Sequence, residues 1–160
     1  MMRDLGAIMS PENAFLTNLG METLALRMER HSSNAARVAE YLSKHDKVEW
    51  VKYGSLESDK YHSLAKKYLP NGQGGMLSFG VRGGAEAATV VMEGLKMIAI
   101  VTHVADVRSC VLHPASTTHR QLSKADLDAI GIADNLIRLS VGIENIDDII
   151  ADLEGALSQI

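Results

Sequence analysis

The stretch NLIRLSVGIENIDDIIADLEGAL, residues Asn135–Leu157, decides the fold class. Its first part, LIRLSVGI at residues 136–143, is rich in β-branched and leucine residues and predicts a strand. Its second part, residues 146–157, carries apolar residues at helical spacing and predicts a closing helix. A strand followed directly by an amphipathic helix is typical of a domain in which helices pack on a sheet.

The same alternation of strands and helices extends upstream. Strands are predicted at 48–53 (VEWVKY), 75–81 (GMLSFGV), 98–104 and 109–112, the third of them a buried strand. Helices are predicted at 58–69, at 85–97 and after the capping-box variant that begins at Ser123. These elements predict an α/β sandwich with a small, mostly antiparallel sheet and helices packed on it.

A helical segment precedes this sheet. Ser10, Pro11 and Glu12 are typical of a helix start, and Gly20 then predicts a kink or two consecutive helices. A long amphipathic helix is predicted from Met21 to Ser43. Its first part is apolar on several faces, which indicates packing on more than one side. We therefore expect two regions, residues 1–45 as a helical segment and residues 46–160 as a small α/β domain.

Composition narrows the class of protein. The 160 residues are 46% hydrophobic and 22% charged, with a formal net charge of −4, as in an ordinary globular domain. The sequence lacks the basic stripe with interleaved aromatic residues that is typical of nucleic-acid-binding proteins. The single Cys110 excludes an intramolecular disulfide, and no apolar run approaches the roughly 20 residues of a membrane helix. We expect a cytoplasmic protein with neither a nucleic-acid nor a membrane partner.

Three groups of residues can carry chemistry: the segment HPASTTH, the pair His103 and Asp106, and Arg138. In HPASTTH, residues 113–119, two histidines flank hydroxyl side chains, which is compatible with a metal site, a Ser–His pair or a tight turn. No zinc-like ligand spacing or nucleophile-elbow glycine supports the first two alternatives, so we expect no metal. His103 and Asp106 can form a proton-transfer pair or only satisfy local hydrogen bonds. Cys110 lies among apolar neighbours with no base beside it.

Arg138 lies inside the otherwise apolar strand at 136–143. A buried charge is costly unless it is paired, so we consider three environments for this side chain. It pairs with a structural carboxylate, it holds a ligand anion through its planar guanidinium, or it lies on an exposed face of the sheet.

Several long segments resemble the C-terminal part of the Cys/Met-metabolism enzymes, which are fold type I pyridoxal-phosphate enzymes. The resemblance covers essentially the whole chain and rests on LGAIMSPENAFLTNLGMETLALRMERHSSNAARVAEYLSKHDKVEWVKYGSLES, GGMLSFGV, HVADVRSCVLHPASTTHRQLS and NLIRLSVGIENIDDIIADLEGAL. Within the family, HPASTTH followed by RQL resembles the O-acetylhomoserine sulfhydrylase branch, which makes homocysteine in methionine and cysteine biosynthesis. Cystathionine γ-synthase, γ-lyases and methionine γ-lyase are the alternatives within the family. A stand-alone small-molecule-binding or interaction module is the alternative of another class.

The resemblance implies roles for particular residues. Arg138 matches the arginine that grips the substrate α-carboxylate, and His103 and Val104 match positions that contact the same carboxylate, partly through backbone. Relatives usually have Ser or Asn where His103 stands. Thr118 and His119 match positions that support this pocket from behind.

The resemblance also implies a pyridoxal-phosphate cofactor and a homo-oligomer, commonly a tetramer. None of the lysines lies in the Ser-x-Thr-Lys type of motif that supplies the Schiff-base lysine. We therefore expect no catalytic residue in this chain. A missing large domain would bind the cofactor, and the chain alone would be inactive.

Overall fold

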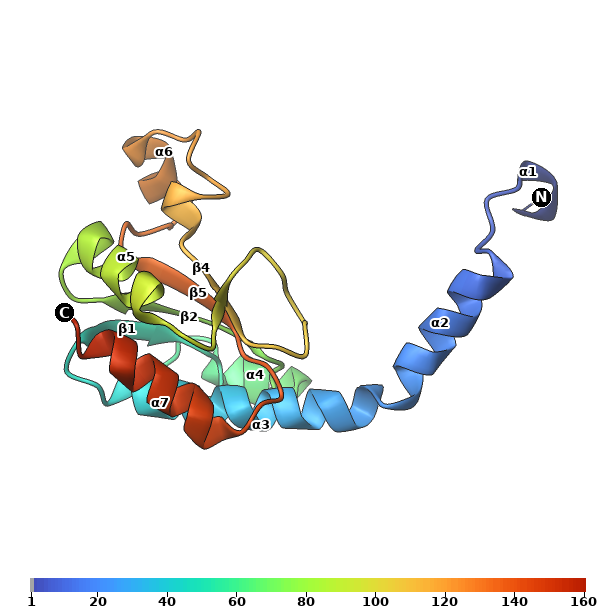
Figure 1. Ribbon diagram of the computed structural model, residues 1–160, viewed down its shortest axis with the longest axis horizontal. Helices are drawn as coiled ribbons and strands as arrows, with labels where there is room; N and C mark the ends of the chain where they lie inside the picture. Colours follow the sequence, from blue (N-terminus) through green and yellow to red (C-terminus); the bar gives the residue numbers. More distant parts are fainter. Residues whose placement is uncertain (1) are drawn as a thin grey trace.

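The computed structural model describes residues 2–160, with side chains from Asp4 onward, and it contains a five-stranded sheet of order β1-β2-β5-β4-β3 (Figure 1). The strands are β1 (Val48–Lys52), β2 (Met76–Val81), β3 (Ala99–Ile100), β4 (Cys110–Leu112) and β5 (Leu136–Ser140). All neighbours pair antiparallel except β3 and β4, which are parallel. The prediction of a small, mostly antiparallel sheet in a mixed α/β fold is confirmed.

Three helices contribute to the core over one face of this sheet. They are α3 (Leu24–Ser43), α5 (Gly84–Gly94) and α7 (Ile146–Leu157), and α7 has the predicted bounds. Alternate strand residues point into this core, so Phe79, Ile137 and Leu139 are fully buried against the helices. The second half of α3 belongs to the same core, since Val38 and Leu42 are also fully buried.

The residues between these core positions point to the opposite side of the sheet, which we call the open face. Register places Ser78 of β2 and Leu112 of β4 on either side of Arg138. Met76 and Cys110 flank Ser140 in the same way. Because directly paired residues share a face, these six side chains line the open face in two neighbouring rows.

An N-terminal arm of α1 (Met2–Leu5) and α2 (Pro11–Glu22) projects from this body (Figure 1). The predicted start of α2 is confirmed, because the Ser10 hydroxyl accepts from the backbone N–H of Asn13 at 3.2 Å. The helix runs through Gly20, and the break falls at Thr23 instead. The Arg27 side chain bridges the two helices there, bonding the Gly20 carbonyl at 2.5 Å and the Thr23 hydroxyl at 3.3 Å.

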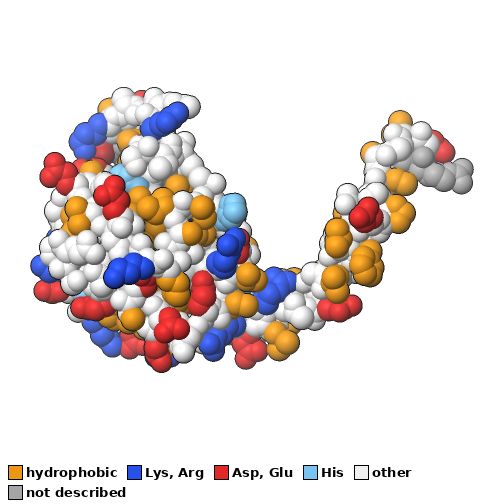
Figure 2. Space-filling view, in the orientation of Figure 1, with side chains coloured by type: hydrophobic (Ala, Val, Ile, Leu, Met, Phe, Trp, Pro, Cys, Tyr) orange, Lys and Arg blue, Asp and Glu red, His pale blue; other side chains and the backbone are white. Residues whose placement is uncertain are grey.

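The arm carries apolar side chains that nothing in the described part of the chain covers. No residue of α2 is buried, and Phe15, Leu16 and Leu19 are all more than half exposed. Figure 2 shows hydrophobic side chains along the arm. Among the described residues, no helix is both long and apolar enough to cross a membrane.

Two helices are shorter than their sequence patterns predict. The segment predicted at 58–69 is helical only as α4 (His62–Tyr68), because the Asp59 carboxylate holds the N–H of Tyr61 in a turn at 2.8 Å. Helix α5 ends at Gly94 rather than Met97. The Asp152 carboxylate captures the next backbone N–H groups, those of residues 96, 97 and 98, at 2.8, 3.1 and 2.9 Å.

The prediction of a buried strand at 98–104 is wrong. Only Ala99 and Ile100 pair with β4, and both are exposed. Residues 102–109 instead form a loop, which we call the 102–109 loop. The chain turns there because Ala105 adopts a left-handed conformation, with φ of 59°, which no regular strand accommodates.

After the loop and β4, the chain forms a short 3-10 helix, η1 (Pro114–Ser116), and then α6 (Lys124–Ala129). The predicted capping box of α6 is confirmed, because Ser123 and Asp126 exchange side-chain-to-backbone hydrogen bonds. The predicted strand at 109–112 is confirmed as β4, which is buried along its length.

Candidate functional site

Arg138 lies on the open face in the middle of the sheet. It is half-buried, and its Nη2 donates to the backbone carbonyl of Thr102 at 3.1 Å. Within residues 4–160 no carboxylate lies within ion-pair distance of the guanidinium, so the alternative of a structural carboxylate partner is wrong. A guanidinium has five donor N–H groups, so most of them remain available for a ligand anion.

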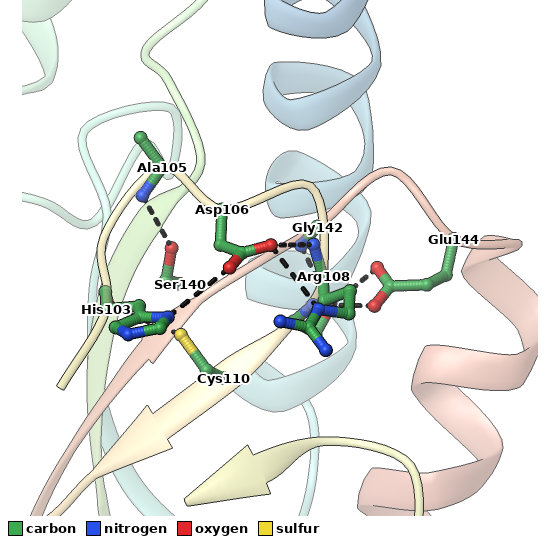
Figure 3. A network of polar contacts seen from close by, with 9 residues as sticks. His103, Ala105, Asp106, Arg108, Cys110, Ser140, Gly142 and Glu144 are labelled. Atoms are coloured by element: carbon green, nitrogen blue, oxygen red, sulfur yellow. Dashed lines mark hydrogen bonds and ion pairs between the residues drawn. The ribbon is translucent and has the colours of Figure 1, made fainter. Parts of the chain in front are cut away.

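The bond from Arg138 brings the 102–109 loop beside β5. Two further contacts hold the loop against β4 and β5 (Figure 3). The Cys110 thiol donates to the carbonyl of His103 at 3.2 Å, and the Ala105 N–H donates to the Ser140 hydroxyl at 3.3 Å. The side chains of His103 and Val104 are exposed. The structure therefore places His103 and Val104 in one loop with the residue that Arg138 holds.

The predicted His103–Asp106 pair exists, although in a loop rather than at a strand end. Nδ1 of His103 lies 3.3 Å from a carboxylate oxygen of Asp106. The other oxygen accepts from the backbone N–H of Arg108 at 3.0 Å, and the Arg108 Nε lies 3.5 Å away. Hydrogen bonds from the backbone and side chain of Arg108, and then from His103, hold the pKa of Asp106 below its ordinary value. The pair thus shapes the loop.

A cluster missed by the sequence reasoning fixes the far end of the loop. The Glu144 carboxylate accepts from the N–H of Ser109 at 2.6 Å and from its hydroxyl at 2.9 Å. The Ser109 hydroxyl in turn accepts from the N–H of Gly142 at 2.8 Å. Asn34 of α3 donates to the carbonyls of Gly142 and Glu144 at 3.0 and 2.9 Å. We call this group the Ser109–Glu144 clamp.

The clamp leaves no room for a side chain at Gly142. A Cβ there would lie 2.5 Å from both the Ser109 nitrogen and the Val107 carbonyl oxygen. The only sequence signal for this requirement is the Gly-Ile-Glu run that follows β5, and that run does not reveal which distant residue it meets.

The HPASTTH segment forms a turn that His113 organises. Nε2 of His113 donates to the Asp134 carbonyl at 2.7 Å, so the Ser116 hydroxyl can donate to Nδ1 at 2.8 Å. The Thr117 hydroxyl donates to the His113 carbonyl at 2.7 Å, which is the hydroxyl-to-backbone bond expected of a tight turn.

Thr118 and His119 contact each other at 2.9 Å through Oγ1 and Nδ1. No hydrogen bond in the described part of the chain joins either residue to Arg138 or to the 102–109 loop. Residues 4–160 hold no group of three His, Cys, Asp or Glu side chains placed to share a metal ion.

Neither the Cys110 thiol nor the lysine side chains lie in a setting that favours reactivity. Burial raises the pKa of the Cys110 thiol, which opposes formation of a reactive thiolate. Seven of the eight lysines are exposed and Lys47 is half-buried. Lys52, Lys60 and Lys67 lie over aromatic rings at 4.9, 4.7 and 5.0 Å. None lies in an enclosed site of the kind that holds a covalently bound cofactor.

Comparisons with known proteins connect this chain with a family. The profile of the family described as "Cys/Met metabolism PLP-dependent enzyme" matches residues 1–158. The O-acetyl-L-homoserine sulfhydrylase of Leptospira meyeri is 48% identical over 99% of this chain and 36% of its own length. The homocysteine synthase of Schizosaccharomyces pombe is 49% identical over 98% and 36%.

A solved structure of a putative O-acetylhomoserine (thiol)-lyase from Campylobacter jejuni, containing a pyridoxyl-lysine monophosphate residue, is also similar. It superposes with a TM-score of 0.89 at 44% identity over 98% of this chain and 37% of that one. The chain thus spans a little over a third of the length of the relatives it matches. The chain belongs to the Cys/Met-metabolism family of pyridoxal-phosphate-dependent enzymes.

Proposed function

We propose that this chain supplies the substrate-carboxylate site of an O-acetylhomoserine sulfhydrylase, which converts O-acetyl-L-homoserine and sulfide to homocysteine and acetate. The observation that carries the proposal is Arg138, which is held on the open face by one backbone carbonyl and has no carboxylate partner among residues 4–160. The relatives that bear this activity in their names support the choice of reaction.

In this proposal Arg138 donates two parallel hydrogen bonds to the α-carboxylate of the amino-acid substrate. His103 and Val104 line the same carboxylate from the loop that Arg138 holds. Thr118 and His119 act without touching the substrate, through the turn that follows β4. Fixing the carboxylate orients the rest of the substrate, and orientation of this kind contributes strongly to rate.

When bound, pyridoxal phosphate serves as the electron sink of the reaction. The lysines of this chain do not fit a covalent cofactor site, because none of the eight is buried. We therefore propose that a separate cofactor-binding domain supplies the lysine and that these 160 residues are inactive alone. We further propose a cytoplasmic protein that assembles as a tetramer.

Two experiments test the proposal. First, the purified chain is mixed with pyridoxal phosphate, reduced with borohydride and analysed by mass spectrometry. We expect no stoichiometric lysine adduct and no turnover of O-acetylhomoserine. One modified lysine together with turnover would contradict the assignment of the chemistry to another domain.

Second, this chain replaces the matching third of the Leptospira meyeri enzyme. In that chimera Arg138→Ala should raise KM for O-acetylhomoserine by roughly 10- to 100-fold, the loss expected for a charged hydrogen-bonded pair. Arg120→Ala, at an exposed arginine outside the site, is the control. An unchanged KM in Arg138→Ala would contradict the carboxylate assignment. Turnover with cysteine in place of sulfide would instead indicate a cystathionine synthase.

A further inference from the structure

A small pocket lies beside the 102–109 loop, on the side of Ser140 rather than of Arg138. Its volume is about 220 Å³, and α3, the start of β2 and the loop contribute its walls. The side chains that line it are Met28, His31, Gln73, Met76, Val104 and Ser140, and none of them is an acid, a lysine or an arginine. We call it the His31 pocket.

His31 is a polar side chain buried to 97% in the wall of this pocket. Its Nδ1 lies 2.7 Å from the Val141 carbonyl oxygen. Because a carbonyl only accepts, Nδ1 carries the hydrogen and Nε2 of the neutral ring is a hydrogen-bond acceptor. Within residues 4–160 Nε2 has no hydrogen-bond partner, and it is not sealed off from solvent-sized space. Within this part of the chain, Nε2 is therefore an accessible, unpartnered acceptor on a side chain that lines the pocket.

These walls define the chemistry of a ligand. The methionine and valine side chains favour an apolar, polarisable molecule. The Ser140 hydroxyl accepts from the Ala105 N–H at 3.3 Å. Nε2 of His31 is an acceptor without a partner among the described residues, and a ring nitrogen, unlike a hydroxyl, can also take up the proton of a donor on the ligand. A volume of this size holds about seven water-sized groups. A charged amino acid does not fit these walls, because burying an unpaired charge is costly.

We propose that the His31 pocket binds the incoming sulfur nucleophile as an uncharged sulfide or small alkanethiol, whose S–H donates to Nε2 of His31. This inference rests on the function proposed above. Ser140 follows Arg138 by two residues on the same face, a spacing of about 6–7 Å along the strand. That spacing is comparable with the distance from the carboxylate of a homoserine derivative to the end of its side chain.

The arrangement also gives His31 a proton to accept. The thiolate rather than the thiol is the nucleophile, so the sulfur must lose its proton before it attacks. The S–H bond breaks, its electron pair stays on sulfur, and the proton passes to Nε2 of His31. The resulting imidazolium keeps its Nδ1–H on the Val141 carbonyl and pairs through Nε2 with the thiolate.

The test uses the 160-residue chain and two isomeric probes, 1-propanethiol and ethyl methyl sulfide, which differ in having or lacking an S–H donor. Binding is followed by the ¹⁵N resonances of the histidine side chains and, in every variant, by the backbone amide resonances of the residues that line the pocket. The variant His31→Asn keeps an N–H at the position of Nδ1 and removes Nε2. Its matched control is His62→Asn, because His62 makes the same contact from Nδ1, to the Gly54 carbonyl at 2.9 Å, outside the His31 pocket.

We expect propanethiol to shift Nε2 of His31 and to bind roughly three- to tenfold more tightly than the thioether, the effect of one hydrogen bond. His31→Asn should abolish this preference at an unchanged urea midpoint, and His62→Asn should retain it. Equal binding of the two probes, or no shift at His31, would overturn the proposal.

A parallel titration with O-acetyl-L-homoserine tests the carboxylate site at Arg138 separately from the His31 pocket. Shifts in the 102–109 loop with this probe, without a response of His31 to the thiol, would refute the pocket assignment alone. No response to either probe would refute the carboxylate site as well.

Discussion

Replacing Ser109 by alanine removes the hydroxyl at the centre of the Ser109–Glu144 clamp. That hydroxyl donates to Glu144 at 2.9 Å and accepts from Gly142 at 2.8 Å, and Ser109 is only 1% exposed. The change deletes two hydrogen bonds and leaves the buried N–H of Gly142 without a partner. A lost hydrogen bond costs about 1 kcal/mol and an orphaned buried donor about 1–3 kcal/mol, so the expected loss of stability is about 2–4 kcal/mol.

Urea denaturation followed by far-UV circular dichroism measures this loss. With a slope of about 2 kcal/mol per molar urea, the midpoint should fall by about 1–2 M. Ser158→Ala is the control, because its hydroxyl makes an exposed hydrogen bond to the Gly155 carbonyl at 2.9 Å, and it should change stability by less than about 0.5 kcal/mol. A double-mutant cycle with Glu144→Gln should give a coupling above about 0.5 kcal/mol. Additive effects, or a midpoint shift as small as that of the control, would refute the clamp.

Three further predictions concern other parts of the fold. Gly80→Ala should destabilise the protein by about 1–3 kcal/mol and alter the fluorescence of Trp50, because the new Cβ would lie 2.3 Å from the indole nitrogen; an unchanged emission spectrum would contradict this contact. Asp152→Asn should lower the urea midpoint, since the carboxylate accepts from three backbone N–H groups that an amide satisfies only in part. The pKa of Asp106 is lowered from 3.8 in the folded state, so its contribution to stability is present above that pH and is lost as the pH falls through the folded value. Asp106→Asn should therefore reduce the loss of stability between pH 6 and pH 3 in urea titrations, and identical acid profiles would exclude this contribution.

Local patterns in the sequence predicted most of the regular structure. The caps of α2 and α6 are side-chain contacts across three residues, Ser10 to Asn13 and Ser123 to Asp126, so both can be read from the sequence. The alternation in β5 is also local, and in the structure Arg138 lies on the side of the sheet away from Ile137 and Leu139. The mixed α/β fold and the family followed from the order of these elements and from the motifs.

The elements that the sequence predicted poorly are those that distant residues terminate. Helix α5 stops early because Asp152, 54 to 56 residues away, captures the N–H groups that would continue it. The strand predicted at 98–104 ends early because Arg138 and Ser140 of β5 hold the backbone of Thr102 and Ala105, which lie 36 and 35 residues earlier in the chain. A β-branched run has the same local preference in both settings, so propensity alone cannot distinguish them.

The sequence by itself determined the order of helices and strands and the family, because caps, periodicity and motifs are encoded among near neighbours. Only the tertiary structure decided how the site is built. The contact of Glu144 with Ser109 spans 35 residues and that of His31 with Val141 spans 110. Which side chains meet across such separations depends on the packing of the whole core, and no local pattern records it.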